Sequence, residues 1–191
     1  RPSALMWHSE ASLVDQPISP ALKFWLSEPK CLTETLKHHY KEITVNLLNM
    51  SEGNPNADEA QYLLGLHESK RFIIRTIYLC AGTKALTFAR VIIPWQTYQH
   101  QQTQFDQLKD NPIGETMLFG RDNVTRSEFE WSLLEKKHWS TIRELSNIVS
   151  SPCDYNITIG ARRSLFFVDK LPLLISEFYF PVIEQLPINI P

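Results

Sequence analysis

The sequence predicts an α+β fold in which one antiparallel sheet carries helices grouped on one side. Two observations predict it: strand-like segments outnumber helix-like segments, and most of the strands are joined by short turns. The length of 191 residues, with 43% hydrophobic and 21% charged residues, suits an ordinary soluble globular chain with a single core. We therefore expect one domain over residues 1–191.

The N-terminal part predicts a helical hairpin followed by a strand. Ser19 can cap a helix whose first residue is Pro20, and Pro29 ends that helix. A second helix is expected over 31–40, with Leu32 on its apolar side. The next segments predict a strand over 41–50, a loop that begins at 51 and a short helix around 58–64.

The central stretch, residues 71–94, predicts a β-hairpin that turns at 81–84. Because alternate residues of a strand share a face, Arg75 stands in the middle of one apolar row and Arg90 in the middle of the other. A guanidinium on a core-facing row is costly unless it is paired, and two of them side by side also repel each other. The hairpin therefore predicts a dry place that holds an anion.

The C-terminal part predicts a second hairpin that carries one carboxylate. The expected elements are a helix over 95–109, a strand over 123–133, a helix within 135–147, and strands over 161–169 and 171–180 that turn at 169–170. Glu177 shares a strand face with Ile175 and Tyr179, so it is a lone carboxylate on an apolar row. It could form a buried structural ion pair with one arginine. Two arginines against one glutamate would still leave a positive charge for an anionic ligand to balance.

A second anion-binding feature is predicted at the start of a short helix. Asn111 can cap this helix and Pro112 suits its first position. The backbone N–H groups of Ile113 and Gly114 then fall among the unsatisfied donors of a helix N-terminus, which suit an anion. The same residues also fit an ordinary helix start.

Composition and motifs disfavour several classes of function. A net charge of −2 and the lack of a Lys/Arg block argue against nucleic-acid binding. No apolar run reaches the roughly 18 residues of a membrane span. No glycine-rich phosphate-binding motif occurs, so we expect no nucleotide cofactor.

The cysteines and the remaining arginine pair are weaker indications. Cys31, Cys80 and Cys153 are far apart and have no metal-ligand spacing, so we expect free thiols in a reducing cytoplasm and no metal site. The adjacent pair Arg162 and Arg163 could bind an anion, but such a pair more often lies on a solvated strand face.

Taken in order, these motifs resemble the chorismate pyruvate-lyase family, whose enzymes open bacterial ubiquinone synthesis by making 4-hydroxybenzoate. The resemblance runs from about residue 17 to residue 181. It rests on RTIYLC with Arg75, TFARVIIP with Arg90, NPIGETMLF around Ile113, VTRSEFEW, and ARRSLFF leading to LPLLISEFYFP with Glu177. The segment 134–160 is longer than the family pattern.

The resemblance implies a six-stranded antiparallel sheet with an internal ligand site that helical flaps close. It implies that Arg75 holds the ring carboxylate of the substrate and that Glu177 contacts the ring hydroxyl. Arg90 would lie near the enolpyruvyl side chain. The family most often has Leu where this chain has Ile113, which offers its N–H to the carboxylate, and Met where Leu32 covers the site.

The implied activity is a cofactor-independent lyase that converts chorismate to 4-hydroxybenzoate and pyruvate, with Arg75, Arg90 and Glu177 as the catalytic residues. Glu177 could orient the C4 hydroxyl or accept a proton. The family is mostly monomeric. The alternative is a domain of the same fold that binds a small acid as an effector without converting it. In transcription regulators such a domain follows a DNA-binding helix-turn-helix, which the segment before Pro17 is too short to hold.

Overall fold

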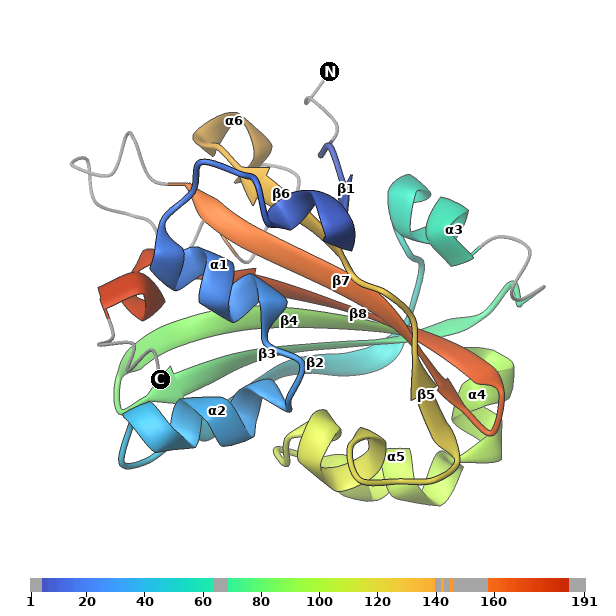
Figure 1. The fold of residues 1–191 in the computed structure, drawn as a ribbon. Helices are drawn as coiled ribbons and strands as arrows, with labels where there is room; N and C mark the ends of the chain where they lie inside the picture. Colours follow the sequence, from blue (N-terminus) through green and yellow to red (C-terminus); the bar gives the residue numbers. More distant parts are fainter. Residues whose placement is uncertain (1–4, 64–68, 140–141, 143–144, 146–157, 186–191) are drawn as a thin grey trace.

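The computed structural model describes residues 5–63, 69–139, 142, 145 and 158–185. These residues form one antiparallel sheet with the strand order β1-β6-β7-β8-β4-β3-β2, and β5 pairs with β7 outside this path (Figure 1). The strands are β1 (His8–Ser9), β2 (Thr44–Gly53), β3 (Phe72–Ala81), β4 (Lys84–Pro94), β5 (Val124–Arg126), β6 (Glu130–Leu134), β7 (Ile159–Val168) and β8 (Leu171–Tyr179). The α+β class with an antiparallel sheet is therefore confirmed.

The sheet has eight strands among the described residues, so the expectation of six was wrong in number. The short strand β1 pairs with the edge of β6 and has no apolar pattern of its own. The strand expected over 123–133 is divided into β5 and β6 because the Ser127 hydroxyl accepts the N–H of Leu165, which interrupts the backbone ladder. A side chain in place of a backbone partner cannot be seen in a hydrophobic pattern.

The predicted hairpin turns and the predicted start of α1 are confirmed, whereas the helix start predicted at Asn111 and Pro112 was wrong, because η2 begins at Gly114 after Ile113 and no side chain caps it. The β7–β8 hairpin turns at Asp169 and Lys170, whose φ angles of 49° and 70° are typical of a two-residue type I′ turn. The Ser19 hydroxyl accepts the N–H of Leu22 and caps α1. The helices are α1 (Pro20–Ser27), α2 (Leu32–His39), α3 (Ala57–Leu63), α4 (Trp95–His100), α5 (Gln102–Leu108), α6 (Lys136–Trp139), a π-helical turn η2 (Gly114–Leu118) and the 3-10 turns η1 (Glu10–Leu13) and η3 (Pro181–Gln185).

One face of the sheet carries two apolar clusters that leave a site between them. Trp25 of α1 and Leu36 of α2 belong to the first cluster, which also contains Ile77 of β3. Phe105 of α5 and Met117 of η2 belong to the second. Figure 1 shows α1, α2 and α5 gathered on the same side of the sheet, with α3 apart from them.

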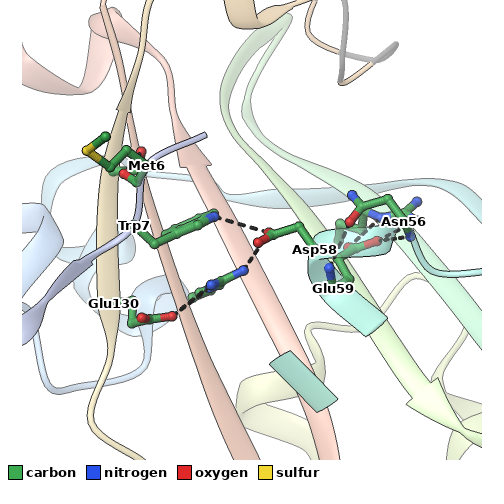
Figure 2. Close-up of polar contacts among 9 residues, drawn as sticks. Met6, Trp7, Asn56, Asp58, Glu59 and Glu130 are labelled. Carbon is green, nitrogen blue, oxygen red and sulfur yellow. Dashed lines mark hydrogen bonds and ion pairs between the residues drawn. The ribbon is translucent and has the colours of Figure 1, made fainter. Parts of the chain in front are cut away.

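The opposite face is covered in part by α3, whose acidic residues meet basic residues of the sheet. Asn56 and Glu59 exchange hydrogen bonds across the first turn of α3, as in a capping box. Asp58 accepts hydrogen bonds from the indole of Trp7 and from Arg163 of β7, at 3.2 and 2.6 Å (Figure 2). The expectation that Arg163 lies on a solvated face was wrong, because these acidic partners come from distant segments and bury it.

Within the described ranges, no helix is long and apolar enough to cross a membrane. Most of the segment 134–160 lies outside the described residues, as does Cys153.

Candidate active site

The site is a pocket on the sheet face that α1, α2 and η2 cover. Strands β3, β4, β5, β7 and β8 form its floor, and the start of α2 and the segment before η2 form its cover. Its lining includes five charged side chains and an apolar surround: Lys30, Cys31, Leu32, Thr33, Arg75, Ile77, Leu79, Ala89, Val91, Pro112, Ile113, Gly114, Phe119, Arg126, Arg162, Ser164, Phe166, Ile175 and Glu177. A few polar groups within an apolar cavity are typical of a small-molecule site.

Arg75 is the most deeply buried charge of the pocket, with 0% of its surface exposed. Its Nη2 group donates to the backbone oxygens of Lys109 and Asn111, both at 2.9 Å, in the loop that precedes η2. Its Nε and Nη1 groups have no hydrogen-bond partner among the described residues. Burial lowers the pKa of Arg75 to about 10, although Asp110 opposes the shift. A buried cation with two unused donors is costly unless an anion completes it.

Glu177 is held on the other side of the pocket by two neighbours. Its Oε2 atom accepts Nε and Nη2 of Arg162 at 3.0 and 2.8 Å and the hydroxyl of Tyr179 at 2.8 Å. Burial alone raises the pKa of Glu177, but Arg162 and Arg126 outweigh it, so the pKa lies below its usual range. Glu177 is therefore an ionised carboxylate, and its Oε1 atom has no hydrogen bond to the described residues.

Arg162 joins this carboxylate to the helical cover. Its side chain is 2% exposed, and its Nη1 group donates to the backbone oxygens of Leu26 and Glu28 at the end of α1. The carbonyls at a helix C-terminus carry partial negative charge, which suits a guanidinium. Through Arg162 the sheet, Glu177 and the end of α1 form one connected unit.

The pocket as a whole is positively charged. Arg75, Arg126 and Arg162 face it with one carboxylate, Glu177, and the exposed Lys30 lies at its edge. Within the described residues, the only ion pair among these buried groups is that of Arg162 with Glu177. Two guanidinium charges therefore remain for a ligand with more than one negative charge.

The structure brings five of the predicted site residues together. Arg75, Glu177, Ile113, Gly114 and Leu32 all line the pocket. A Cβ atom at Gly114 would lie 3.0 Å from the sulfur of Cys31, so the lack of a side chain lets the start of α2 pack closely onto η2. Burial raises the pKa of the Cys31 thiol, which keeps it protonated.

Arg90 does not belong to this pocket, and its prediction beside Arg75 was wrong. In the β3–β4 register, Arg75 lies opposite Val91 and Arg90 opposite Thr76, so the two arginines point to opposite faces of the sheet. Arg90 forms a two-point ion pair with Glu59 of α3, at 2.8 and 2.9 Å. It attaches α3 to the far face of the sheet.

Two arginines of the pocket, Arg162 and Arg126, were not predicted as site residues from the sequence. Arg162 looks like half of a solvated pair, and its partner Glu177 lies 15 positions away on the next strand. Arg126 sits in a strand whose alternation is broken at Ser127. The register of the β7–β8 hairpin could have indicated the position of Arg162. A two-residue turn at Asp169-Lys170 places Arg162 directly opposite Glu177.

A family model described as chorismate lyase matches residues 2–186. This chain belongs to the chorismate lyase family. It is 30% identical over 183 residues to a protein of Aromatoleum aromaticum named "Probable chorismate pyruvate-lyase", covering 94% of this chain and 97% of that protein. It is 29% identical over 167 residues to a protein of the same name from Methylococcus capsulatus, covering 87% and 98%.

Solved structures share the fold at much lower identity. The C-terminal domain of the histidine utilization repressor from Pseudomonas syringae has a TM-score of 0.51 and 12% identity, covering 78% of this chain and 99% of that one. A ligand-binding domain of the GntR family from Bordetella bronchiseptica has a TM-score of 0.51 and 12% identity, covering 73% and 85%. At this identity the likeness concerns the fold alone.

Proposed function

We propose that this member of the chorismate lyase family converts chorismate to 4-hydroxybenzoate and pyruvate, as a cofactor-independent lyase of ubiquinone synthesis. The observation that carries the proposal is Arg75, a fully buried guanidinium that lines the pocket and whose Nε and Nη1 groups have no hydrogen-bond partner among the described residues. Such a group fits the planar carboxylate of a ring acid, which accepts two parallel hydrogen bonds. The whole chain would act as one domain, as a monomer in the cytoplasm.

In this proposal, Arg75 and the N–H of Ile113 hold the ring carboxylate. Both belong to one assembly, because Arg75 donates to the backbone of the loop that ends at Pro112. The apolar lining, which includes Leu32 of the cover, excludes water from the ring. Fixing the substrate in a dry site lowers the barrier chiefly through orientation.

Glu177 would act on the opposite end of the ring. As an ionised carboxylate it accepts a hydrogen bond from the C4 hydroxyl through Oε1, while Oε2 stays bound to Arg162 and Tyr179. The reaction breaks the bond between C3 and the ether oxygen and removes the hydrogen on C4. That proton ends on the methylene carbon of the departing enolpyruvyl group, which leaves as pyruvate, and the ring becomes aromatic. Aromatisation supplies the driving force, so no redox partner is required.

The product keeps the ring carboxylate and the hydroxyl, so it should bind tightly and leave slowly from beneath the cover. We expect competitive inhibition by 4-hydroxybenzoate. An inhibition constant far above the Michaelis constant for chorismate would contradict this expectation.

The deciding experiment mixes the purified protein with chorismate and separates the products by chromatography. We expect 4-hydroxybenzoate and pyruvate in equal amounts, and neither from Glu177→Ala or Arg75→Ala variants that keep the circular dichroism of the wild type. If chorismate survives while 4-hydroxybenzoate raises the melting temperature, the chain is an effector-binding domain instead.

A further inference from the structure

Arg126 is the one guanidinium of the pocket that has no assigned task. It comes from β5, and its Nε group donates to the hydroxyl of Ser164 on β7 at 3.0 Å. Its guanidinium carbon lies 5.1 Å from the centre of the Phe166 ring. These contacts fix one edge and the plane of the group, and they leave Nη1 and Nη2 without a partner among the described residues.

Arg126 forms no salt bridge with the residues that the structure describes, although the charges of Glu177 and Glu10 favour its charged form. In the described part of the chain, no carboxylate lies within ion-pair distance of Arg126. The carboxylate of Glu177, which also lines the pocket, pairs with Arg162 instead. Burial lowers the pKa of Arg126, and the charge of Arg162 lowers it further. A preorganised cation in this position would gain more from an anion than a solvated one would.

The position of Arg126 indicates which part of a ligand it faces. Arg126 donates to Ser164, which lies two residues from Arg162 on the same face of β7, and Arg162 lies opposite Glu177 on β8. Arg126 therefore lies toward the end of the pocket that holds Glu177. In the proposed orientation this end receives the C4 hydroxyl, and the enolpyruvyl ether is attached to the neighbouring carbon C3.

We propose that Arg126, held by Ser164, binds the carboxylate of the enolpyruvyl side chain and so distinguishes the dianionic substrate from the monoanionic product. This inference rests on the proposed function. Arg75 binds the carboxylate that substrate and product share, whereas Arg126 binds the carboxylate that leaves with pyruvate. Arg126 takes the role that the family resemblance implies for Arg90.

The test compares substrate and product in an Arg126→Gln variant of the full chain. Glutamine can still reach Ser164 but carries no charge. We expect the Michaelis constant for chorismate to rise about 10- to 100-fold, which corresponds to the loss of a charge-assisted contact. The dissociation constant of 4-hydroxybenzoate, measured by calorimetry, should change less than about threefold.

Two further variants accompany it. Arg71→Gln removes an exposed arginine that pairs with Glu52 outside the pocket, and it should change neither constant. Ser164→Ala keeps the charge of Arg126 but removes its support, so it should raise the Michaelis constant for chorismate by a smaller factor than Arg126→Gln does. If Arg126→Gln does not fold, Arg126→Lys and Ser164→Ala decide the question by the same two measurements.

The possible outcomes distinguish a failure of this inference from a failure of the proposed function. If the wild type converts chorismate but Arg126→Gln weakens the binding of chorismate and of 4-hydroxybenzoate equally, or weakens the binding of neither, the inference is overturned. The proposed lyase activity then still holds. A wild-type protein that neither converts nor binds chorismate overturns both. If Arg126→Gln weakens the binding of chorismate but not that of 4-hydroxybenzoate, the result supports both the inference and the proposed function.

Discussion

Glu177 and Arg162 lie directly opposite each other on β8 and β7, and two N–H groups of the arginine donate to the same glutamate oxygen. This geometry divides the carboxylate into a structural oxygen, Oε2, and an oxygen, Oε1, that accepts no hydrogen bond from the described part of the chain. The same guanidinium also binds two backbone oxygens at the end of α1. One ion pair therefore orients the proposed catalytic carboxylate and anchors part of the cover above it.

Replacing Arg162 by methionine should cost about 3–5 kcal/mol in the free energy of unfolding, because it leaves the carboxylate of Glu177 buried without its partner. Urea denaturation followed by fluorescence measures this loss. The double variant Arg162→Met, Glu177→Leu should recover a large part of it, since no charge then remains unpaired. A loss below about 1 kcal/mol in the single variant would show that this pair does not hold the site together.

Glu177 also predicts how stability depends on pH. Its pKa is lowered in the folded state, so it contributes stability above its usual pKa of 4.5 that is lost as the pH falls through the folded value. Between these two values the unfolded chain binds more protons, so the free energy of unfolding should rise with pH. The slope should be smaller in Glu177→Gln. An identical slope in wild type and variant would contradict the lowered pKa.

Arg90 provides the contrast with the pocket arginines. Arg90→Gln leaves the carboxylate of Glu59 without its ion pair on the far face of the sheet, and Glu59 is only 6% exposed. We expect a loss of roughly 2–4 kcal/mol in stability. At a temperature where the variant is folded, its kcat/KM for chorismate should stay within about twofold of the wild type. A fall of a hundredfold or more would place Arg90 in the chemistry after all.

The fold could be predicted from the sequence because its signals are local. Turn residues such as Asp169-Lys170 and caps such as Ser19 act over a few positions, and they fix where strands and helices begin. The error at Arg90 has a different origin. The pairing of Ala81 with Lys84 at the predicted turn would place Arg75 opposite Arg90 if it continued unbroken, but a β-bulge next to Cys80 adds one residue to β4, so Arg75 lies opposite Val91 instead. A shift of one residue in register moves Arg90 to the opposite side.

The site was predictable only in part for the same reason. Arg75, Glu177 and Ile113 stand out as polar groups or helix starts in their own segments. Arg162 and Arg163 look alike in the sequence, yet they face opposite sides of the sheet and meet different acids, Glu177 and Asp58. Such pairings depend on contacts between segments that are far apart in the chain.

Gly114 predicts how tightly the cover closes. A methyl group there would lie 3.0 Å from the sulfur of Cys31 and 3.3 Å from the ring of Phe119, so Gly114→Ala should push the start of α2 outward. We expect weaker inhibition by 4-hydroxybenzoate, by about 3- to 10-fold, with little change in the circular dichroism. Stopped-flow release of the product measures the effect. Adding Cys31→Ala removes one of the crowded atoms and should restore part of the affinity, and no difference between the single and double variants would contradict this account.

Arg75 predicts a ligand effect that can be measured without turnover. At a concentration 100 times its dissociation constant, 4-hydroxybenzoate should stabilise the wild type by about 2.7 kcal/mol, which corresponds to a rise of roughly 5–10 °C in Tm. Arg75→Met should show no rise, because it removes Nε and Nη1, the two donors that have no partner among the described residues and would bind the carboxylate. Since burial lowers the pKa of Arg75 only to about 10, the arginine stays charged at neutral pH, and the rise in Tm should be constant between pH 6 and 8. Arg90→Gln, which removes the same charge from the opposite face, is the matched control and should respond like the wild type. A full response in Arg75→Met would mean that the anion binds elsewhere.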